Sequence, residues 1–271
     1  MDKKEELVRQ YFTEALGKKI YSCYKSDSPL FGESYFINDA YVIYDYCKED
    51  ISLLSLERLQ SIYDVLGPLN LSEKLIGIDP DNKIKVTKLV HGDLSYEDKP
   101  SENQIRNVAK ALKKLHKNSS EYDVAPDLVS EFYELKEFAD KKIGKILENR
   151  IVREFKEIKD KTPLGLCHNY LSKDNVIYRY DSVLFVDYEL GNINYLYFDL
   201  ASYIFLNNID DELRYLFLTT YFGASYNSLK GKRVEIFLNF VKAYYYYMYQ
   251  YLYKVTNNEK YLNLVEAMKI E

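Results

Sequence analysis

Residues 166–203 read LCHNYLSKDNVIYRYDSVLFVDYELGNINYLYFDLASY and form the most informative part of the chain. Three short segments in and beside it, 165–167, 175–178 and 183–187, have the β-branched and aromatic character of strands and alternate with polar loops. Loops held by a rigid scaffold commonly carry binding and catalytic residues. The stretch therefore predicts a functional site at the ends of short strands.

The chain opens with a helical pattern that has a capping box at Asp2 and Glu5 and stops at Gly17, and sheet-forming sequence follows. Residues 19–90 contain several segments rich in β-branched and aromatic residues, separated by turn residues such as Asn38-Asp39 and Asp79-Pro80-Asp81-Asn82. One helical pattern interrupts them at residues 52–66 and stops at Gly67-Pro68. The pattern predicts a small, largely antiparallel sheet with one inserted helix.

After Gly92 the pattern changes from strands to helices. Apolar residues recur at helical spacing over 101–116, which starts with a Ser-x-x-Gln cap, and again over 127–159. The chain is therefore expected to be an α+β protein of two lobes. A small N-terminal sheet lobe covers residues 1–92, and a larger, mostly helical C-terminal lobe covers residues 93–271.

Two polar loops carry the ligands that a magnesium ion prefers. Asn175 ends the first loop, and Asp187 and Glu189 follow the hydrophobic strand twelve residues later. Phosphoryl transfer depends on positioning and charge neutralisation by Mg²⁺, which binds hard oxygen atoms of carboxylates and amides. We therefore predict that Asn175 and Asp187 hold Mg²⁺, with Glu189 as an additional ligand directly or through water.

The two loops and the segment after them resemble the choline/ethanolamine kinase family, within the aminoglycoside-phosphotransferase-like kinases. That family has the pattern HNDxxxxN, then a hydrophobic strand ending in IDFE, then NYxxFD. Here the corresponding blocks are HNYLSKDN at 168–175, VDYE at 186–189 and NYLYFD at 194–199. Asn169 after the histidine favours choline kinases over aminoglycoside kinases, which more often have glycine there.

The resemblance implies a protein-kinase-like two-lobe fold and a specific activity. The activity is the ATP- and Mg²⁺-dependent phosphorylation of a small amino alcohol, choline or ethanolamine. It places Asn175 and Asp187 at the nucleotide-bound metal, and His168 in the catalytic loop, where it shapes the loop through hydrogen bonds. Because choline kinases hold a quaternary ammonium between aromatic side chains of a late helix, Tyr246 and Tyr249 are the candidate substrate residues.

The sequence departs from the family at four positions. Tyr170 stands where the family has its catalytic Asp, and a phenol with a pKa near 10 is a poor base at neutral pH. Gly32 is the one glycine where a Gly-rich turn is expected, and Tyr44 replaces the basic residue of the strand that follows. Glu57 is displaced from the register of the expected helix glutamate. We therefore expect slow phosphorylation and a weakened nucleotide clamp.

Two other functions remain open on this sequence. The first is a pseudokinase that keeps the fold and binds a ligand or partner without turnover. The second is a kinase for another small alcohol, such as an aminoglycoside or thiamine. His91-Gly92-Asp93 imitates an aminoglycoside-kinase HGD motif, but no Asn follows at the required spacing, so we interpret it as the exit of the hinge between the lobes.

Composition excludes several other classes of protein. A net charge of -5 argues against a protein that binds nucleic acid through phosphate contacts. No apolar run is long enough for a membrane span, and the charged N-terminus is unlike a signal peptide, so a cytoplasmic protein is expected. The three cysteines, Cys23, Cys47 and Cys167, suggest no disulfide framework or zinc site and are expected to be buried thiols.

Overall fold

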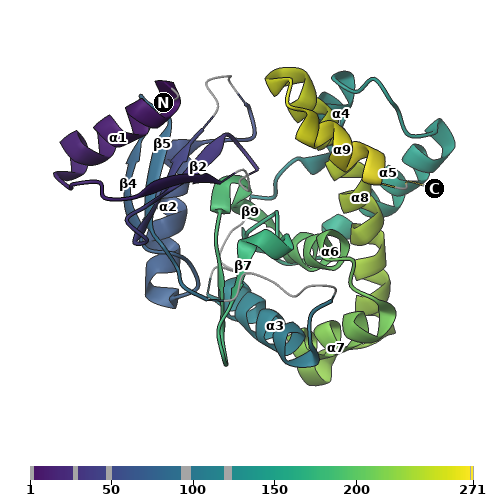
Figure 1. Cartoon of the computed structure of the whole chain (residues 1–271). Helices are drawn as coiled ribbons and strands as arrows, with labels where there is room; N and C mark the ends of the chain where they lie inside the picture. The colour runs from purple at the N-terminus through teal and green to yellow at the C-terminus, as the bar shows by residue number, and fades with distance from the viewer. Residues whose placement is uncertain are drawn as a thin grey trace.

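The computed structural model describes residues 3–26, 30–46, 51–92, 99–118, 124–268 and 270. A sheet lobe that carries the N-terminus stands beside a helical lobe that carries the C-terminus (Figure 1). The predicted α+β architecture, a small sheet lobe followed by a larger helical one, is confirmed. Within the described ranges, no helix is both long and apolar enough to cross a bilayer.

The described part of the N-terminal lobe is an antiparallel sheet with a helix on each face. Its strands are β1 (Cys23–Ser26), β2 (Glu33–Ile37), β3 (Tyr41–Asp45), β5 (Ile84–Lys88) and β4 (Leu75–Asp79), in this spatial order. The helices are α1 (Lys3–Leu16) and α2 (Leu56–Leu66). Ile43 packs with Phe12 of α1, whereas its neighbour Tyr44 packs in the cluster that contains Leu59 of α2. Central strand β3 is therefore buried on both faces.

Gly32 brings the turn before β2 against the end of β3. Its φ is +67°, and a Cβ atom there would stand 2.1 Å from the carbonyl oxygen of Asp45. A residue with a side chain would clash at this position, so the turn requires glycine.

The helical lobe is built around one long helix. The helices are α3 (Glu102–Lys117), α4 (Leu128–Glu137), α5 (Lys145–Lys159), α6 (Leu196–Leu206), α7 (Asp211–Phe222), α8 (Ser228–Thr256) and α9 (Glu259–Ala267). Helix α8 packs against α4, α5, α6 and α9. The capping box predicted for Ser101 and Gln104 is present at the start of α3. The helical pattern predicted over 127–159 forms two helices, because the chain turns between α4 and α5, where Gly144 is the N-cap of α5.

Two short antiparallel strand pairs lie where the helical lobe meets the sheet lobe (Figure 1). Strand β6 (Leu164–Cys167) pairs with β9 (Asn192–Tyr195), and β7 (Val176–Tyr178) pairs with β8 (Val183–Phe185). Short 3₁₀ helices follow β6 and β8, namely η2 (Lys173–Asn175) and η3 (Tyr188–Leu190); two others are η1 (Gly67–Leu69) and η4 (Gly223–Ser225). The strand pairs place the two predicted loops beside each other.

The segment after β5 packs against β7. A Cβ at Gly92 would stand 2.7 Å from Ile177 Cγ2 and from the carbonyl oxygen of Tyr178, so the backbone lies directly on this strand. Asp93, which completes the HGD sequence, lies outside the described residues, and the lobe boundary at residue 92 stays a prediction.

The predicted burial of the cysteines holds in part. Cys167 is buried and Cys23 is only half-buried. Cys47 lies outside the described residues.

Candidate functional site

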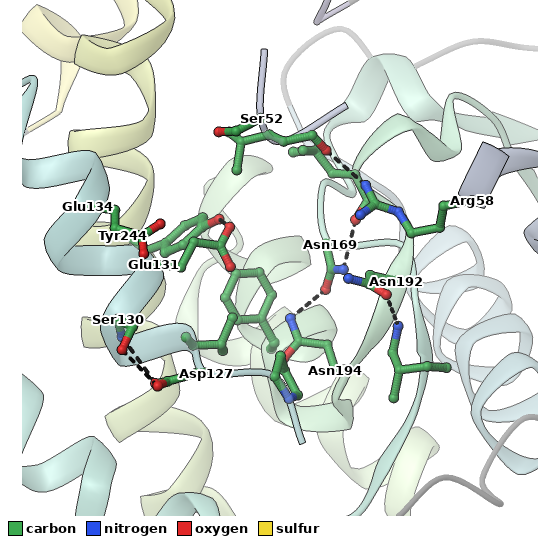
Figure 2. A pocket seen from close by; sticks show the side chains of 16 residues that line it. Ser52, Arg58, Asp127, Ser130, Glu131, Glu134, Asn169, Asn192, Asn194 and Tyr244 are labelled. Atoms are coloured by element: carbon green, nitrogen blue, oxygen red, sulfur yellow. Dashed lines mark hydrogen bonds between the residues drawn. The ribbon is translucent and has the colours of Figure 1, made fainter. Parts of the chain in front are cut away.

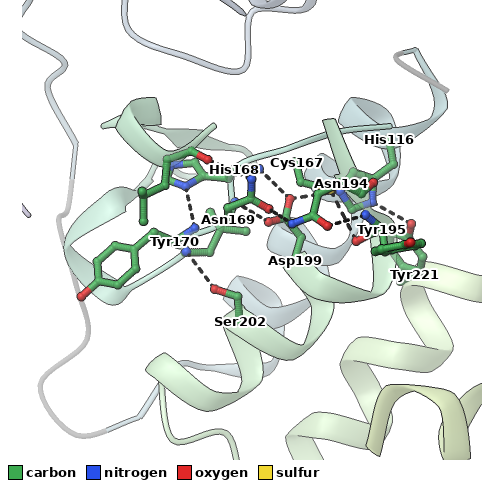
Figure 3. A network of polar contacts seen from close by, with 12 residues as sticks. His116, Cys167, His168, Asn169, Tyr170, Asn194, Tyr195, Asp199, Ser202 and Tyr221 are labelled. Carbon is green, nitrogen blue, oxygen red and sulfur yellow. Dashed lines mark hydrogen bonds and ion pairs between the residues drawn. The ribbon is translucent and has the colours of Figure 1, made fainter. Parts of the chain in front are cut away.

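Asp199 of α6 anchors the loop that follows β6. It is fully buried, and its two carboxylate oxygens accept hydrogen bonds from the main-chain N–H groups of His168 at 2.8 Å and Asn169 at 2.7 Å. His116 of α3 lies 3.1 Å from the same carboxylate (Figure 3). Asn169 has a left-handed backbone with φ of 63°, which asparagine tolerates better than most residues. The aspartate of the third sequence block thus fixes the path of the first loop.

His168 connects the first loop to the strand that precedes Asp187. Burial lowers the pKa of the imidazole, so the ring is neutral at pH 7. The Nε2 atom lies 2.7 Å from the carbonyl oxygen of Val186, to which it donates, and Nδ1 accepts from the Tyr170 N–H at 3.3 Å. Both ring nitrogens therefore contact main-chain groups of the two loops, and neither is left over for another partner.

Tyr170 points away from the Asp199 network (Figure 3), and its hydroxyl contacts Tyr249 of α8. Its hydroxyl lies 2.9 Å from the Tyr249 hydroxyl, and its ring packs edge-on against Tyr245 with 5.6 Å between the ring centroids. Burial raises the pKa of Tyr170 to about 12. The phenol is therefore protonated at neutral pH and lies in an aromatic cluster. A general base would have to be unprotonated there, so Tyr170 cannot act as one in this state.

The two predicted substrate residues lie on different sides of α8. Tyr249 is buried beside Tyr170. Tyr246 is half-buried and packs against Tyr247. Most of the tyrosines in this run are core residues, since Tyr244, Tyr245, Tyr247, Tyr249 and Tyr251 are all buried. The structure therefore brings Tyr249, but not Tyr246, to the first loop.

The three predicted metal ligands lie on the two loops that the short strand pairs bring together. Asn175 ends η2, and its side-chain Nδ2 donates to the Tyr170 carbonyl at 2.9 Å. The main-chain carbonyl oxygen of Asn175 accepts from the Val186 N–H at 3.0 Å. Asp187 follows Val186 with a left-handed φ of 63°. Its Oδ1 atom is buried and has no hydrogen-bond partner within the described ranges. Glu189, two residues on, is buried in η3.

A buried lysine of β5 meets these carboxylates, and the sequence interpretation did not identify it. Lys85 has no exposed surface, and its Nζ lies 2.7 Å from Glu189 Oε1 and 3.8 Å from Asp187 Oδ1. Glu73 Oε1 also lies 3.8 Å from this nitrogen. The Tyr46 hydroxyl donates to Glu189 at 2.6 Å. We call Glu73, Lys85, Asp187 and Glu189 the lysine–carboxylate cluster.

The lysine–carboxylate cluster holds more acidic groups than basic ones. Burial and the neighbouring Glu189 charge raise the pKa of Asp187 to about 8, and burial raises the pKa of Glu73. Burial also opposes ionisation of Glu189, but the charge of Lys85 outweighs it and lowers the pKa of Glu189. Burial disfavours the Lys85 ammonium, yet the surrounding carboxylates outweigh that effect and raise its pKa. The ion pair of Lys85 and Glu189 is therefore formed at neutral pH.

The cluster has the chemistry of a divalent-cation site. Three carboxylates surround a single ammonium, and the buried Oδ1 atom of Asp187 has no hydrogen-bond donor. A buried carboxylate oxygen without a donor is costly unless it is protonated or bound to a cation. Carboxylate and amide oxygens are also the ligands that Mg²⁺ prefers. Asp187 Oδ1 is thus an oxygen open to a cation, whereas Glu189 Oε1 is already paired with Lys85; the assignment of Asn175, Asp187 and Glu189 to Mg²⁺ stays a prediction.

Glu57 does not contact the lysine. It lies exposed in the first turn of α2. The acid that accompanies Lys85 from the sheet lobe is Glu73, which precedes β4 and accepts a hydrogen bond from Tyr63 of α2. Helix α2 therefore reaches the cluster through a tyrosine and a neighbouring loop glutamate.

A cavity of about 360 Å³ opens beside the first loop, between α4, α8 and η3 (Figure 2). Its wall includes three acidic residues around α4, namely Asp127, Glu131 and Glu134, and the ring of Tyr244. The Tyr244 hydroxyl donates to Glu131 at 2.5 Å, and burial raises the pKa of Glu131. Neither Tyr246 nor Tyr249 lines this cavity.

Arg58 connects the cavity to the metal-ligand loop. It lines the cavity together with Asn169, and its Nη2 lies 3.5 Å from the carbonyl oxygen of Glu189. A molecule in the cavity would therefore lie beside both predicted loops.

Comparison with solved structures identifies the fold. The chain superposes on the choline kinase LicA from Streptococcus pneumoniae with a TM-score of 0.81 at 15% sequence identity, covering 98% of this chain and 97% of LicA. For a choline/ethanolamine kinase family protein from Mesorhizobium loti the TM-score is 0.78 at 14% identity, with 97% and 92% of the two chains covered. For the GDP complex of aminoglycoside 2'-phosphotransferase-IIIa it is 0.70 at 15% identity, with 98% of each chain covered.

Comparisons of sequence give no match. No family model matches the chain, and no curated protein matches it. The motifs of residues 166–203 nevertheless resemble the same group of kinases that the structural comparison finds. The chain therefore has the two-lobe fold shared by the choline and ethanolamine kinases and the aminoglycoside phosphotransferases.

Proposed function

We propose that this protein transfers the γ-phosphoryl group of ATP to the hydroxyl of a small amino alcohol such as choline or ethanolamine. The observation that carries this proposal is the lysine–carboxylate cluster beside an acidic cavity that shares the Glu189 loop. Phosphoryl transfer needs positive charge at the phosphates and a second site that positions the acceptor. The cluster would supply that charge through Lys85 together with a Mg²⁺ ion held by its carboxylates, and the neighbouring cavity would position the acceptor.

Asn175, Asp187 and Glu189 would hold Mg²⁺ in this site. The ion would neutralise phosphate charge and orient the γ-phosphate. His168 and Asp199 would keep the first loop in place through their main-chain hydrogen bonds. A structure of LicA with AMP and the GDP complex of the aminoglycoside enzyme support a nucleotide as the phosphoryl donor.

We place the cationic end of the acceptor in the cavity lined by Glu131 and Tyr244. An ammonium group binds favourably to carboxylates and to the faces of aromatic rings in a partly dry site. Glu131, Glu134 and Asp127 supply the carboxylates, and Phe198 and Tyr244 supply the rings. This assignment replaces Tyr246 and Tyr249 as the proposed substrate contacts, because neither lines the cavity.

The alternative of ligand binding without turnover is favoured by one observation. The residue at the position of the catalytic Asp is Tyr170, and its phenol is buried and neutral. A lost general base typically costs about 10²- to 10⁴-fold in rate. Because the transition state of phosphoryl transfer is largely dissociative, positioning and Mg²⁺ alone can sustain slow transfer. We therefore propose an enzyme with a low turnover number.

The test is transfer of labelled phosphate from ATP to a set of alcohols. The acceptors are choline, ethanolamine, an aminoglycoside and thiamine, each with excess Mg²⁺. We expect a labelled product from choline or ethanolamine, and none when Asp187→Asn replaces the natural protein. Asp181→Asn, in the exposed turn between β7 and β8, is the matched control and should leave the rate unchanged. A natural protein that labels none of the four acceptors over many hours would refute the kinase proposal.

A further inference from the structure

Lys85 and Tyr44 are direct partners across two neighbouring strands. Strands β3 and β5 are antiparallel, and Tyr44 pairs with Lys85 in their register. Directly opposed residues of an antiparallel pair point to the same face of the sheet, with Cβ atoms about 5 Å apart. The Lys85 Nζ lies 3.8 Å from the centroid of the Tyr44 ring, within the range of a cation–π contact. The two side chains therefore share one place on the face that meets the helical lobe.

The lysine is directed at the carboxylates of the other lobe. Glu189 and Asp187 belong to the helical lobe, and Lys85 reaches both from the sheet. Lys85 is the only buried lysine or arginine among the described residues. Burying an ammonium is unfavourable unless paired charges repay its desolvation. One carboxylate would be enough to neutralise the ammonium, yet carboxylate oxygens of Glu73, Asp187 and Glu189 all lie within 3.8 Å of Lys85 Nζ.

We propose that Lys85 is the cation that contacts the phosphates of the nucleotide, supplied by β5 in place of the β3 position that Tyr44 occupies. This inference rests on the proposed nucleotide site. The triphosphate carries more negative charge than one Mg²⁺ neutralises, so a site for it needs a further fixed cation near the metal ligands. Lys85 lies 3.8 Å from Asp187 Oδ1, and Tyr44 holds its ammonium by a ring face, which offers no competing charge.

Glu73 acts in this arrangement as the positioning residue for Lys85. Its Oε1 accepts from the Tyr63 hydroxyl and lies 3.8 Å from the lysine nitrogen. Tyr63 belongs to α2, so the helix fixes Glu73, and Glu73 fixes the lysine.

The test compares the binding of ATP and of adenosine by calorimetry, with Mg²⁺ and without an acceptor. Lys85→Met should weaken ATP binding by about 10- to 100-fold, as expected for loss of a charged hydrogen bond, and leave adenosine binding unchanged. Lys88→Met is the matched control, because Lys88 also lies on β5 over a tyrosine ring, that of Tyr41, but on the opposite face of the sheet. It should change neither affinity.

Exchanging the side chains of Tyr44 and Lys85 tests whether ATP affinity can be restored. The double variant Tyr44→Lys with Lys85→Tyr returns the cation to β3, at the same place on the sheet face. We expect it to recover most of the ATP affinity that Lys85→Met loses. Equal losses of ATP and adenosine binding in Lys85→Met, or no loss of either, would overturn the proposal.

A lysine-labelling reagent tests the proposal on the natural protein, so the result does not depend on whether the Lys85 variants fold. An acyl phosphate of ATP transfers its acyl group to a nearby lysine: the ammonium loses a proton to a neighbouring carboxylate or to water, the amine attacks the acyl carbon, the acyl–oxygen bond breaks, an amide forms, and ATP leaves. Mass spectrometry should find the amide on Lys85, with protection by ATP but not by adenosine. Labelling confined to other lysines would overturn the inference. Phosphate transfer to the alcohols is measured separately, so a protein without turnover can still show labelled Lys85, and an active protein can still lack it.

Discussion

The imidazole of His116 lies 3.1 Å from the Asp199 carboxylate, so that α3 and α6 jointly support the first loop. The other ring nitrogen of His116 lies 2.7 Å from the Tyr221 hydroxyl of α7. Asp199 in turn accepts from the main chain of His168 and Asn169. Three helices and the loop thus meet in one buried polar network, and loss of one member leaves each of its neighbours with one partner fewer.

The first prediction concerns the stability of this network. His116→Leu keeps most of the volume but leaves Tyr221 and Asp199 each short of a buried partner. Each unsatisfied buried group costs about 1 to 3 kcal/mol, so with two such groups the free energy of unfolding should fall by about 2 to 6 kcal/mol. Urea denaturation measures it. His91→Leu, at an exposed histidine, is the control, and a loss of the same size in both variants would contradict the role assigned to the network.

The second prediction concerns Mg²⁺ and nucleotide together. A ligand that binds only the folded state stabilises it by RT ln(1 + [L]/Kd), so the melting temperature rises with the logarithm of the ligand concentration once this exceeds Kd. We expect millimolar Mg-ATP to raise the Tm of the natural protein and of Asp181→Asn, and to leave that of Asp187→Asn unchanged. Absence of a shift in the natural protein would count against a live nucleotide site.

The third prediction follows from the raised pKa of Asp187, which is about 8 because of burial and the Glu189 charge. An unfolded Asp has a pKa of about 3.9, so between these values the folded protein keeps a proton that the unfolded chain has lost. The resulting stabilisation is complete below about pH 4 and is lost as the pH rises to about 8. Relative to Asp187→Asn, the natural protein should therefore lose stability between pH 5 and pH 8.

Urea unfolding of both proteins at several pH values, without metal, measures this difference. Mg²⁺ should reverse the trend, because it binds the ionised carboxylate and displaces the proton. A stability difference that stays constant from pH 5 to pH 8 would show that Asp187 ionises normally in the folded state.

The fourth prediction concerns the acidic cavity. Glu131→Gln removes a charge but keeps the hydrogen-bonding shape beside Tyr244. If the cavity holds the ammonium of the acceptor, the KM for choline or ethanolamine should rise by about tenfold, with a smaller effect on kcat. Glu137→Gln is the control, because Glu137 is exposed at the end of the same helix and does not line the cavity. An unchanged KM in Glu131→Gln would remove the cavity from the acceptor site.

The sequence predicted the parts of the site that lie close together along the chain. Asn175 and Asp187 could be found because each ends or follows a short hydrophobic strand within one local motif. The two-lobe architecture could also be predicted, because periodicity changes from strand to helix after Gly92. These signals are local, and the structure preserves them.

Contacts that depend on pairing across the sheet could not be predicted in the same way. From the sequence, Tyr44 indicated that the cation of β3 is lost. Lys85 could not be recognised as its neighbour, because the register that places the two residues opposite each other is a long-range property of β3 and β5. One signal was available: Lys85 alternates with Ile84 and Val86 in a buried strand, where a lysine needs a partner. Tyr246 and Tyr249 share a helical spacing, but the spacing does not say which residue meets the first loop.

The last prediction concerns Tyr170, which occupies the position of the family's catalytic carboxylate. Burial raises the pKa of this phenol to about 12, so it cannot accept a proton from an alcohol at neutral pH. Tyr170→Asp would place a carboxylate on a loop that Asp199 and His168 already hold. We expect the rate of phosphocholine formation to rise by about tenfold or more under saturating Mg-ATP, given the usual value of a general base.

Tyr170→Phe separates the base from the packing. It removes the hydroxyl contact with Tyr249 but keeps the ring against Tyr245, so the slow rate of the natural protein should remain. The time course of phosphocholine formation is followed for all three proteins. If the natural protein turns over at ordinary kinase rates and both substitutions slow it, then the Tyr170 hydroxyl takes part in the reaction. In that event the proposed low turnover number would be wrong, and the hydroxyl pair of Tyr170 and Tyr249 would be the candidate proton acceptor.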